Sequence, residues 1–268
     1  MTVEPTRTGE RAAGERGEES RRRDPVPGND RDPVLELDGV TRAFGHETAI
    51  DDLSLSVGGG QYHCLLGPNG SGKSTVMRLI LGLTRPTDGR IESPAATIGC
   101  GFQQPNFYPG LTVRENIRVF ASLVGASDWE WNQTVVSELR LSRALEREAG
   151  DLSGGFARRL DLALALIKRP EFLLLYEPLG ALDDVSQERL LDFLGRYAGD
   201  GHTVLVSTHE ITEFEPYTDR VTVLHRGERV LDRTVGDIPL EDGESLQSYY
   251  VDTVLAREGV TTAGSDDA

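Results

Sequence analysis

The chain has 268 residues, of which 38% are hydrophobic, and a formal net charge of −16 at pH 7. This size allows one large domain or two small ones, and the acidic excess argues against broad nucleic-acid binding, because contact with phosphate backbones needs a surplus of Lys and Arg. The Arg- and Glu-rich start does not resemble a secretory signal, and no apolar run approaches the roughly 18 to 20 residues that span a bilayer. We therefore expect a cytoplasmic protein whose contact with a membrane requires a partner.

The cations of the chain are almost all arginines. Lys73 and Lys168 are the only lysines. An acidic, lysine-poor surface stays hydrated at high ionic strength and resembles proteins of salt-loving microbes. A GC-rich genome is the alternative explanation, and the two can hold together.

Apolar spacing and turn residues divide the chain into a polar tail and an alternation of strands and helices. Residues 1–32 contain almost no large apolar side chain and are expected to be a disordered tail. In chain order, the patterns then predict strands at 34–37, 53–57 and 62–66, a helix at 75–83, strands at 90–93 and 97–102, helices from 112 onward and over 128–139 and 156–167, a strand at 172–175, a helix at 185–197, a strand at 203–207, a hairpin over 221–231 and a helix over 244–257. Strands that alternate with helices indicate an α/β fold with a largely parallel central sheet.

One stretch, QYHCLLGPNGSGKST, carries the clearest chemical signal. An apolar strand leads into it, a helix follows, and Gly67, Gly72, Lys73 and Ser74 match the pattern G-x-x-x-x-G-K-[ST]. This context distinguishes a phosphate-binding loop from an ordinary glycine turn. The glycines, with Gly70, let consecutive N–H groups point at phosphate oxygens at the positive end of the helix. Lys73 is placed to reach the β- and γ-phosphates, and Ser74 to ligate Mg²⁺.

Six further motifs stand with this loop in the order and approximate spacing of one protein family. They are Phe44, Gln103, Leu-Ser-Gly-Gly at 152–155, the apolar strand that leads into Glu177, Ala-Leu-Asp at 181–183, and His209. The loop alone leaves adenylate kinases, GTPases and helicases open, but Leu-Ser-Gly-Gly ahead of an apolar strand and Glu-Pro excludes them. Over residues 34–237 the chain resembles the ATP-binding-cassette (ABC) ATPases. The resemblance implies a P-loop NTPase fold with a mostly parallel central sheet, an antiparallel β subdomain and a helical subdomain.

The resemblance also implies that the chain binds ATP and Mg²⁺. The residues that it assigns to nucleotide binding are Phe44, Gly67, Pro68, Asn69, Gly70, Ser71, Gly72, Lys73, Ser74, Thr75, Ser153, Gly154, Gly155 and Asp183. Phe44 would stack on adenine, and its alternative is a core aromatic at a strand end. Ser153 and the two glycines after it would meet the γ-phosphate bound to the opposite protomer, although a simple helix cap also fits Ser-Gly-Gly. Asp183 would communicate across the dimer.

Three residues are assigned to catalysis by the same resemblance. Glu177 would be the general base that polarises the attacking water, and His209 would contact the γ-phosphate. Gln103, in preference to its neighbour Gln104, would reach the metal and the water, so Ser74 and Gln103 are the predicted metal ligands. A lone Glu-Pro after a strand would otherwise be an ordinary loop start.

Two positions depart from the family pattern. Tyr176 stands where the family has an acidic residue that helps to hold the hydration shell of Mg²⁺. A phenol is neutral at physiological pH and brings no formal charge to the metal, so we expect nucleotide binding to survive and hydrolysis to be slowed. Phe156 stands where Gln is usual and is expected to alter helix packing more than chemistry.

The leading functional hypothesis is an ATPase subunit that powers transport by separate transmembrane permease subunits, most similar to ABC-2-type exporters. It would act as a homodimer, or as a heterodimer with another cassette, without nucleic acid and bound through the permease to the cytoplasmic face of the cell membrane. One alternative is a cassette with weak or no hydrolysis that serves as the degenerate partner in a heterodimer, and another is a soluble, non-transport ABC ATPase. The predicted divisions are a tail at 1–32, a nucleotide-binding domain at 33–237 with a helical subdomain at about 106–160, and a C-terminal helix and frayed tail at 238–268.

Overall fold

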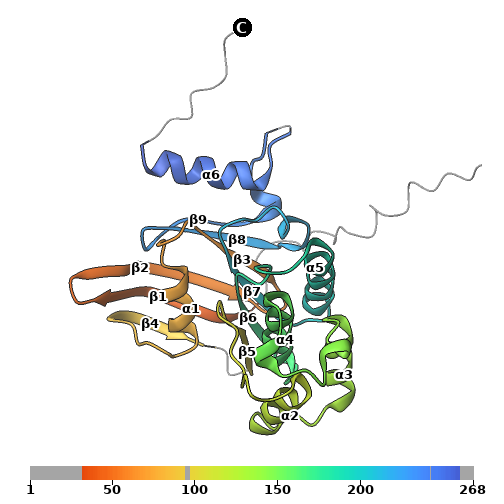
Figure 1. The fold of residues 1–268 in the computed structure, drawn as a ribbon. Coiled ribbons are helices and arrows are strands. Elements are labelled where there is room, and N and C mark those ends of the chain that lie inside the picture. Colours follow the sequence, from red (N-terminus) through yellow and green to blue (C-terminus); the bar gives the residue numbers. More distant parts are fainter. Residues whose placement is uncertain (1–31, 94–96, 242, 260–268) are drawn as a thin grey trace, which may run out of the picture.

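A computed structural model of the chain describes residues 32–93, 97–241 and 243–259 (Figure 1). Residues 1–31 of the predicted tail and residues 260–268 lie outside the described residues. The strands are β1 (Pro33–Phe44), β2 (Glu47–Gly58), β3 (Tyr62–Leu66), β4 (Asp88–Glu92), β5 (Ile98–Gly101), β6 (Phe172–Tyr176), β7 (Thr203–Thr208), β8 (Arg220–His225) and β9 (Glu228–Thr234). The α-helices are α1 (Lys73–Ile80), α2 (Val113–Leu123), α3 (Trp129–Glu138), α4 (Gly154–Leu166), α5 (Asp184–Gly199) and α6 (Leu246–Arg257).

The described strands form two sheets. The central sheet has the order β5-β6-β7-β3-β8-β9. Its first five strands in this order pair in parallel, and β9 is antiparallel to β8. A second, antiparallel sheet has the order β2-β1-β4. The predicted α/β fold with a largely parallel central sheet and an antiparallel β subdomain is confirmed.

Three predicted elements differ clearly in extent from the observed ones. The strands predicted at 34–37 and 53–57 are the outer ends of one long hairpin, in which β1 continues to Phe44 and β2 starts at Glu47. Register shifts between these strands interrupt the alternation of apolar side chains, which hid the hairpin from the sequence pattern. The helix predicted at 75–83 begins at Lys73 and ends at Ile80. Each of the other predicted strands and helices overlaps an observed element.

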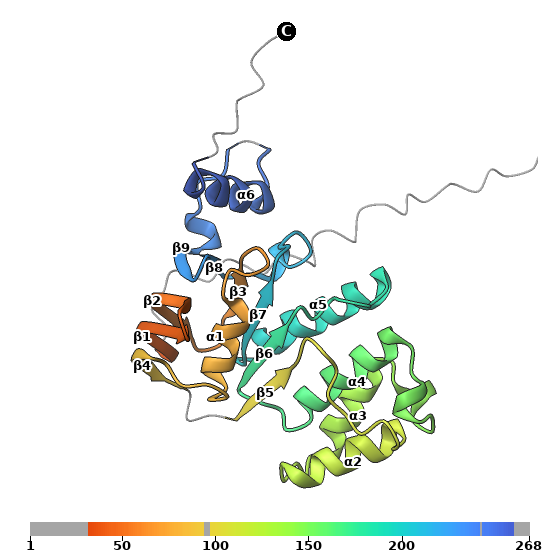
Figure 2. The ribbon, with the colours of Figure 1, turned by 60° about the vertical axis from the view of Figure 1, so that its left-hand side comes forward.

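Hydrophobic packing covers both faces of the central sheet. The helix α1 lies between the two sheets (Figure 1), and its buried apolar side chains share one cluster with β1, β2 and the central strands. A second cluster on the other face joins the sheet to α4 and α5 and extends into α2 and α3. Figure 2 shows α2, α3 and α4 grouped on the side of the molecule away from β1, β2 and β4. This two-sided burial is what a parallel sheet requires.

The helix α6 lies beside β8 and β9 at one edge of the central sheet (Figure 1). Ser245 caps its start by accepting a hydrogen bond from the backbone N–H of Ser248, and Leu246 and Tyr250 bury their side chains. Across the described ranges, no helix combines the length and the apolar content needed to cross a membrane.

Candidate functional site

Three chain segments meet at one edge of the central sheet, where β3, β6 and β7 end. In the parallel register Leu66 of β3 pairs with Thr208 of β7, and Tyr176 of β6 pairs with Ser207. Glu177 directly follows the end of β6. In the sheet order the segment after β7 lies next to it, and the glycine loop after β3 comes after that. Ligands of open α/β sheets bind in the crevice at the carboxyl ends of the strands.

The glycine loop is packed so closely at Gly67 and Gly72 that side chains would not fit there. Gly72 has a φ of 106°, and a Cβ there would lie 2.6 Å from Cδ1 of Ile50. The Lys73 ammonium group donates hydrogen bonds to the carbonyl oxygens of Gly67 at 2.5 Å and Pro68 at 3.1 Å. Because α1 begins at Lys73, the first N–H groups of the helix lack intrahelical partners and can bind an anion.

A cleft of about 420 Å³ opens beside this loop. The residues that line it are Glu47, Thr48, Ala49, Asn69, Gly70, Ser71, Gly72, Lys73, Ser74, Thr75, Tyr176 and Arg226. Residues 69–75 were predicted to bind nucleotide, whereas Arg226 and the start of β2 were missed by the sequence analysis. Burial lowers the pKa of Lys73, and the negative charge of Glu177 acts in the opposite direction. The cleft combines a helix N-terminus with two cationic side chains, which suits a polyphosphate.

Phe44 lies at the end of β1, outside the set of described residues that line the cleft. Its side chain is 46% exposed, and the guanidinium carbon of Arg42 lies 4.2 Å from the centre of its ring. This exposure excludes the alternative of a core aromatic. The stacking of Phe44 on adenine stays a prediction.

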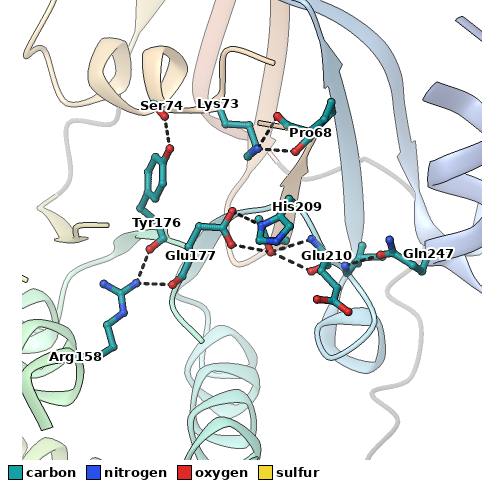
Figure 3. Close-up of polar contacts among 12 residues, drawn as sticks. Pro68, Lys73, Ser74, Arg158, Tyr176, Glu177, His209, Glu210 and Gln247 are labelled. Atoms are coloured by element: carbon teal, nitrogen blue, oxygen red, sulfur yellow. Dashed lines mark hydrogen bonds and ion pairs between the residues drawn. The ribbon is translucent and has the colours of Figure 1, made fainter. Parts of the chain in front are cut away.

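The phenol of Tyr176 reaches across the cleft to the start of α1. Its hydroxyl group shares a hydrogen bond with the hydroxyl group of Ser74, as Figure 3 shows. The ring is partly buried and packs against the cluster that contains α1. The residue that departs from the family pattern is therefore in contact with the predicted metal ligand.

A buried arginine holds the backbone on either side of this position. Arg158 is 3% exposed and donates from Nη2 to the carbonyl oxygens of Tyr176 and, at 2.8 Å, Glu177 (Figure 3). It also donates to the carbonyls of Phe102 and Pro178 and pairs with the buried carboxylate of Asp161 at 3.2 Å. This clamp was not predicted from the sequence, although the oppositely charged pair at i and i+3, Arg158 and Asp161, was a usable signal.

The residues at the predicted metal position do not fit Mg²⁺ as arranged. Mg²⁺ requires oxygen ligands in near-octahedral geometry and retains several waters, but the Ser74 hydroxyl is engaged by the Tyr176 phenol. Gln103, the other predicted ligand, is exposed in the loop after β5. Within the described residues there is also no group of three or more His, Cys, Asp or Glu side chains that could hold a metal ion.

Glu177 and His209, by contrast, are in direct contact. Nδ1 of His209 donates to Oε1 of Glu177 at 2.9 Å, and the Thr208 hydroxyl donates to the other carboxylate oxygen at 3.2 Å (Figure 3). The Glu177 side chain is 23% exposed, so water can reach it. Two residues beyond His209, the N–H of Ile211 donates to Oε1 of Gln247 in α6 at 2.9 Å. This contact between α6 and the histidine loop was not predicted.

The remaining predicted residues lie together away from this cleft. Ser153 is exposed at the start of α4, and within the described structure its side chain makes no capping hydrogen bond. The two glycines after it pack beside Ala181, so closely that a Cβ at Gly155 would lie 3.0 Å from the Ala181 carbonyl oxygen. Asp183 caps α5 by accepting from the hydroxyl group of Ser186 at 2.8 Å and from its N–H at 3.0 Å. These hydrogen bonds, the hydroxyl group's first, hold the pKa of the Asp183 carboxyl group below the ordinary value.

Comparison with known proteins identifies relatives over most of the chain. Residues 50–180 match the family model described as "ABC transporter". The "Nod factor export ATP-binding protein I" of Rhizobium johnstonii is 37% identical over 220 residues, which cover 76% of this chain and 70% of that protein. The protein of the same name from Ralstonia nicotianae is 34% identical over 221 residues, with 77% and 68% covered.

Solved structures agree with this relationship. A structure described as the ATP-binding subunit of an ABC transporter has a TM-score of 0.76 and 26% identity, covering 82% of this chain and 99% of that one. A dimeric bacterial ABC transporter cassette has a TM-score of 0.68 and 28% identity, with 75% and 98% covered. A cassette bound to ADP and phosphate has a TM-score of 0.67 and 28% identity, again with 75% and 98% covered. The chain belongs to the ABC transporter family, as an ATP-binding subunit.

Proposed function

We propose that this chain is the ATP-hydrolysing subunit of an exporter and powers transport through separate transmembrane permease subunits. The observation that carries the proposal is the convergence of a phosphate-binding loop with the Glu177–His209 pair at one edge of the sheet. The similarity to proteins named for Nod factor export favours an exporter of the ABC-2 type.

The glycine loop and Lys73 would hold the triphosphate. Lys73 now donates to the carbonyls of Gly67 and Pro68, and it can exchange these for the stronger, charge-assisted bonds to phosphate oxygens. The N–H groups at the start of α1 supply further donors without any change of conformation. Phe44 would stack on the adenine ring.

Glu177 would act as the general base. Its carboxylate takes a proton from a water molecule as the water oxygen attacks the γ-phosphorus and the bond to the β–γ bridging oxygen breaks, giving ADP and phosphate. His209 orients the carboxylate through its Nδ1–H, and its other ring nitrogen is left to contact the γ-phosphate. Gln103 would help to position the water. The predicted metal role of Ser74 and Gln103 is not part of this proposal, and no step here depends on a metal ion.

A second cassette would complete the site. Ser153 is exposed and is not among the described residues that line the chain's own cleft. Its hydroxyl group, with the amides of Gly154 and Gly155, is therefore available for the γ-phosphate of an opposite protomer. Asp183 would lie at the same contact. The similar cassette that is dimeric supports this arrangement, and the partner is either a second copy or a related cassette.

The divisions and location of the protein follow from the same proposal. We assign residues 33–237 to the nucleotide-binding domain, with the helical subdomain at about 106–160 docking on the permease, and residues 238–268 to the C-terminal helix and tail. The permease would hold the chain at the cytoplasmic face of the membrane.

A second candidate function is favoured by the contact between Tyr176 and Ser74. In this alternative the chain binds nucleotide and dimerises but hydrolyses ATP weakly, as the degenerate partner of an intact cassette. Replacing Tyr176 with Asp would then raise ATP turnover, whereas equal rates in the two proteins would exclude slowed hydrolysis caused by Tyr176.

The test is steady-state ATP turnover measured beside ATP-induced dimerisation on the same purified chain. Turnover together with dimerisation supports the ATPase proposal. Dimerisation without turnover supports the second candidate. A chain that shows neither, at any tested salt concentration and also when mixed with its cognate cassette, would overturn both.

A further inference from the structure

The position beside the Ser74 hydroxyl is filled by a side chain of this protein. The Tyr176 phenol hydrogen-bonds the Ser74 hydroxyl group and lines the cleft with it (Figure 3). The distance in sequence between the two residues is 102 positions, so tertiary packing creates the contact.

Three kinds of contact hold Tyr176 in this position. Its backbone pairs with Ser207 of β7 in the parallel sheet, and its carbonyl oxygen accepts from the buried Arg158. Its ring packs against the cluster between the sheets. The strand pairing and the arginine fix the backbone of Tyr176, and moving the ring away from Ser74 would break its packing against this cluster.

The charges around the cleft can meet a polyphosphate without a metal ion. Among the described residues that line the cleft, Lys73 and Arg226 are cations and Glu47 is the one carboxylate. Arg226 belongs to the turn between β8 and β9, which is tied to the loop by a hydrogen bond from the N–H of Gly227 to the Ser71 carbonyl at 3.0 Å. The carboxylate nearest to Tyr176 in sequence, Glu177, is already engaged by His209 and Thr208.

We propose that this site binds ATP without a divalent cation bridging Ser74 and the phosphates, because the Tyr176 phenol takes the place of that cation and its waters. The inference rests on the proposed nucleotide binding and defines the form of nucleotide that the site accepts. Lys73, the N–H groups at the start of α1 and Arg226, which would exchange its 3.4 Å ion pair with Glu258 for one with phosphate, balance the phosphate charge in place of the metal.

The experiment is calorimetric titration of the full chain with ATP, in excess EDTA and in MgCl₂ at matched ionic strength. For the natural chain we expect dissociation constants that differ by less than about threefold between the two media. Tyr176→Asp should bind ATP at least about tenfold more tightly with Mg²⁺ than with EDTA, because it restores a charged oxygen beside Ser74. Tyr108→Asp, which changes an exposed tyrosine outside the residues that line the cleft, is the matched control and should stay insensitive to Mg²⁺.

The possible outcomes distinguish failure of this inference from failure of the proposed function. ATP binding by the natural chain that weakens about tenfold or more in EDTA would overturn the inference and leave the proposed function standing. A natural chain that binds ATP in neither medium would overturn the proposed function and the inference with it. If Tyr176→Asp fails to fold, the comparison of the natural chain in the two media still decides the inference.

Discussion

Tyr176 and Glu177 are consecutive residues, yet their side chains contact different neighbours, and of the two only Tyr176 is among the described residues that line the cleft. Tyr176 contacts Ser74 at the start of α1, whereas Glu177 contacts His209 and Thr208 after β7 (Figure 3). Glu177 has a φ of 43°, an uncommon conformation outside glycine that turns the chain sharply at the strand end. The side facing α1 has lost the family's acidic residue, while the other side keeps its carboxylate–histidine pair.

Under the proposed function, nucleotide binding and chemistry are positioned by separate side chains. A single guanidinium group, that of Arg158, holds the backbone carbonyls of both residues. The side chain at 176 can therefore change without moving the carboxylate at 177. Substitutions around Tyr176 and Ser74 should therefore alter ATP binding, whereas substitutions around Glu177 should alter ATP turnover.

Glu177→Gln tests the catalytic side and has the largest expected effect. Removing the general base should lower ATP turnover by about 10²- to 10⁴-fold, with little change in ATP affinity. Turnover by phosphate release and affinity by calorimetry measure the two quantities, and Glu210→Gln, an exposed neighbour, is the control. If Glu177→Gln lost ATP affinity together with turnover, Glu177 and the phosphate-binding loop would not act independently.

Arg158→Met tests the clamp that both sides share. It should lower the free energy of unfolding by about 3–5 kcal/mol, because it leaves the buried Asp161 carboxylate without its partner. Denaturant titration measures the loss, with Arg118→Met, an exposed position on α2, as the control.

The pH dependence of the Arg158→Met variant follows from Asp161. Burial raises the pKa of this carboxyl group from 3.8 to about 6 in the folded chain. The folded chain therefore keeps the proton to higher pH than the unfolded chain, and stability is lost as pH rises from about 4 through 6. Without the arginine this loss should grow, so the stability deficit of the variant should be larger at pH 8 than at pH 5. A deficit that does not change with pH would show that Asp161 is not the source.

Lys73→Ala tests the phosphate-binding side. The loss of charge-assisted hydrogen bonds to phosphate should weaken ATP binding by about 10- to 150-fold. Calorimetric titration measures the change, and Lys168→Ala, which removes the chain's other and exposed lysine, is a charge-matched control. Unchanged affinity in Lys73→Ala would contradict the assignment of the loop.

Gln247→Ala tests whether α6 supports the catalytic side, and its expected effect is the smallest. Loss of the acceptor for the Ile211 N–H should lower kcat about 2- to 10-fold through a less ordered His209 loop, with KM for ATP unchanged. Gln247→Glu retains the acceptor oxygen and should recover most of the rate, while Gln133→Ala on α3 controls for a surface change. A rise in KM with constant kcat would place the effect on nucleotide binding instead.

Patterns along the chain determined a large part of this protein. The glycine loop, its flanking strand and helix, and the positions of Glu177 and His209 after apolar strands are local features, because each depends on residues close in sequence. The order of strands and helices predicted the α/β fold for the same reason. The hairpin of β1 and β2 was only partly predicted, since its bulges shift the side-chain alternation on which strand prediction relies.

Tertiary structure alone decided the contacts between distant segments. It placed the Tyr176 phenol on Ser74, set Arg158 against four backbone carbonyls and brought Gln247 to the histidine loop. The sequence indicated only that Tyr176 lacks the charge of the acidic residue usual at this position. The packing of the sheet against α1 makes it a group that fills the position beside Ser74. Side-chain direction in such contacts depends on strand register and packing across the whole fold, which no local pattern records.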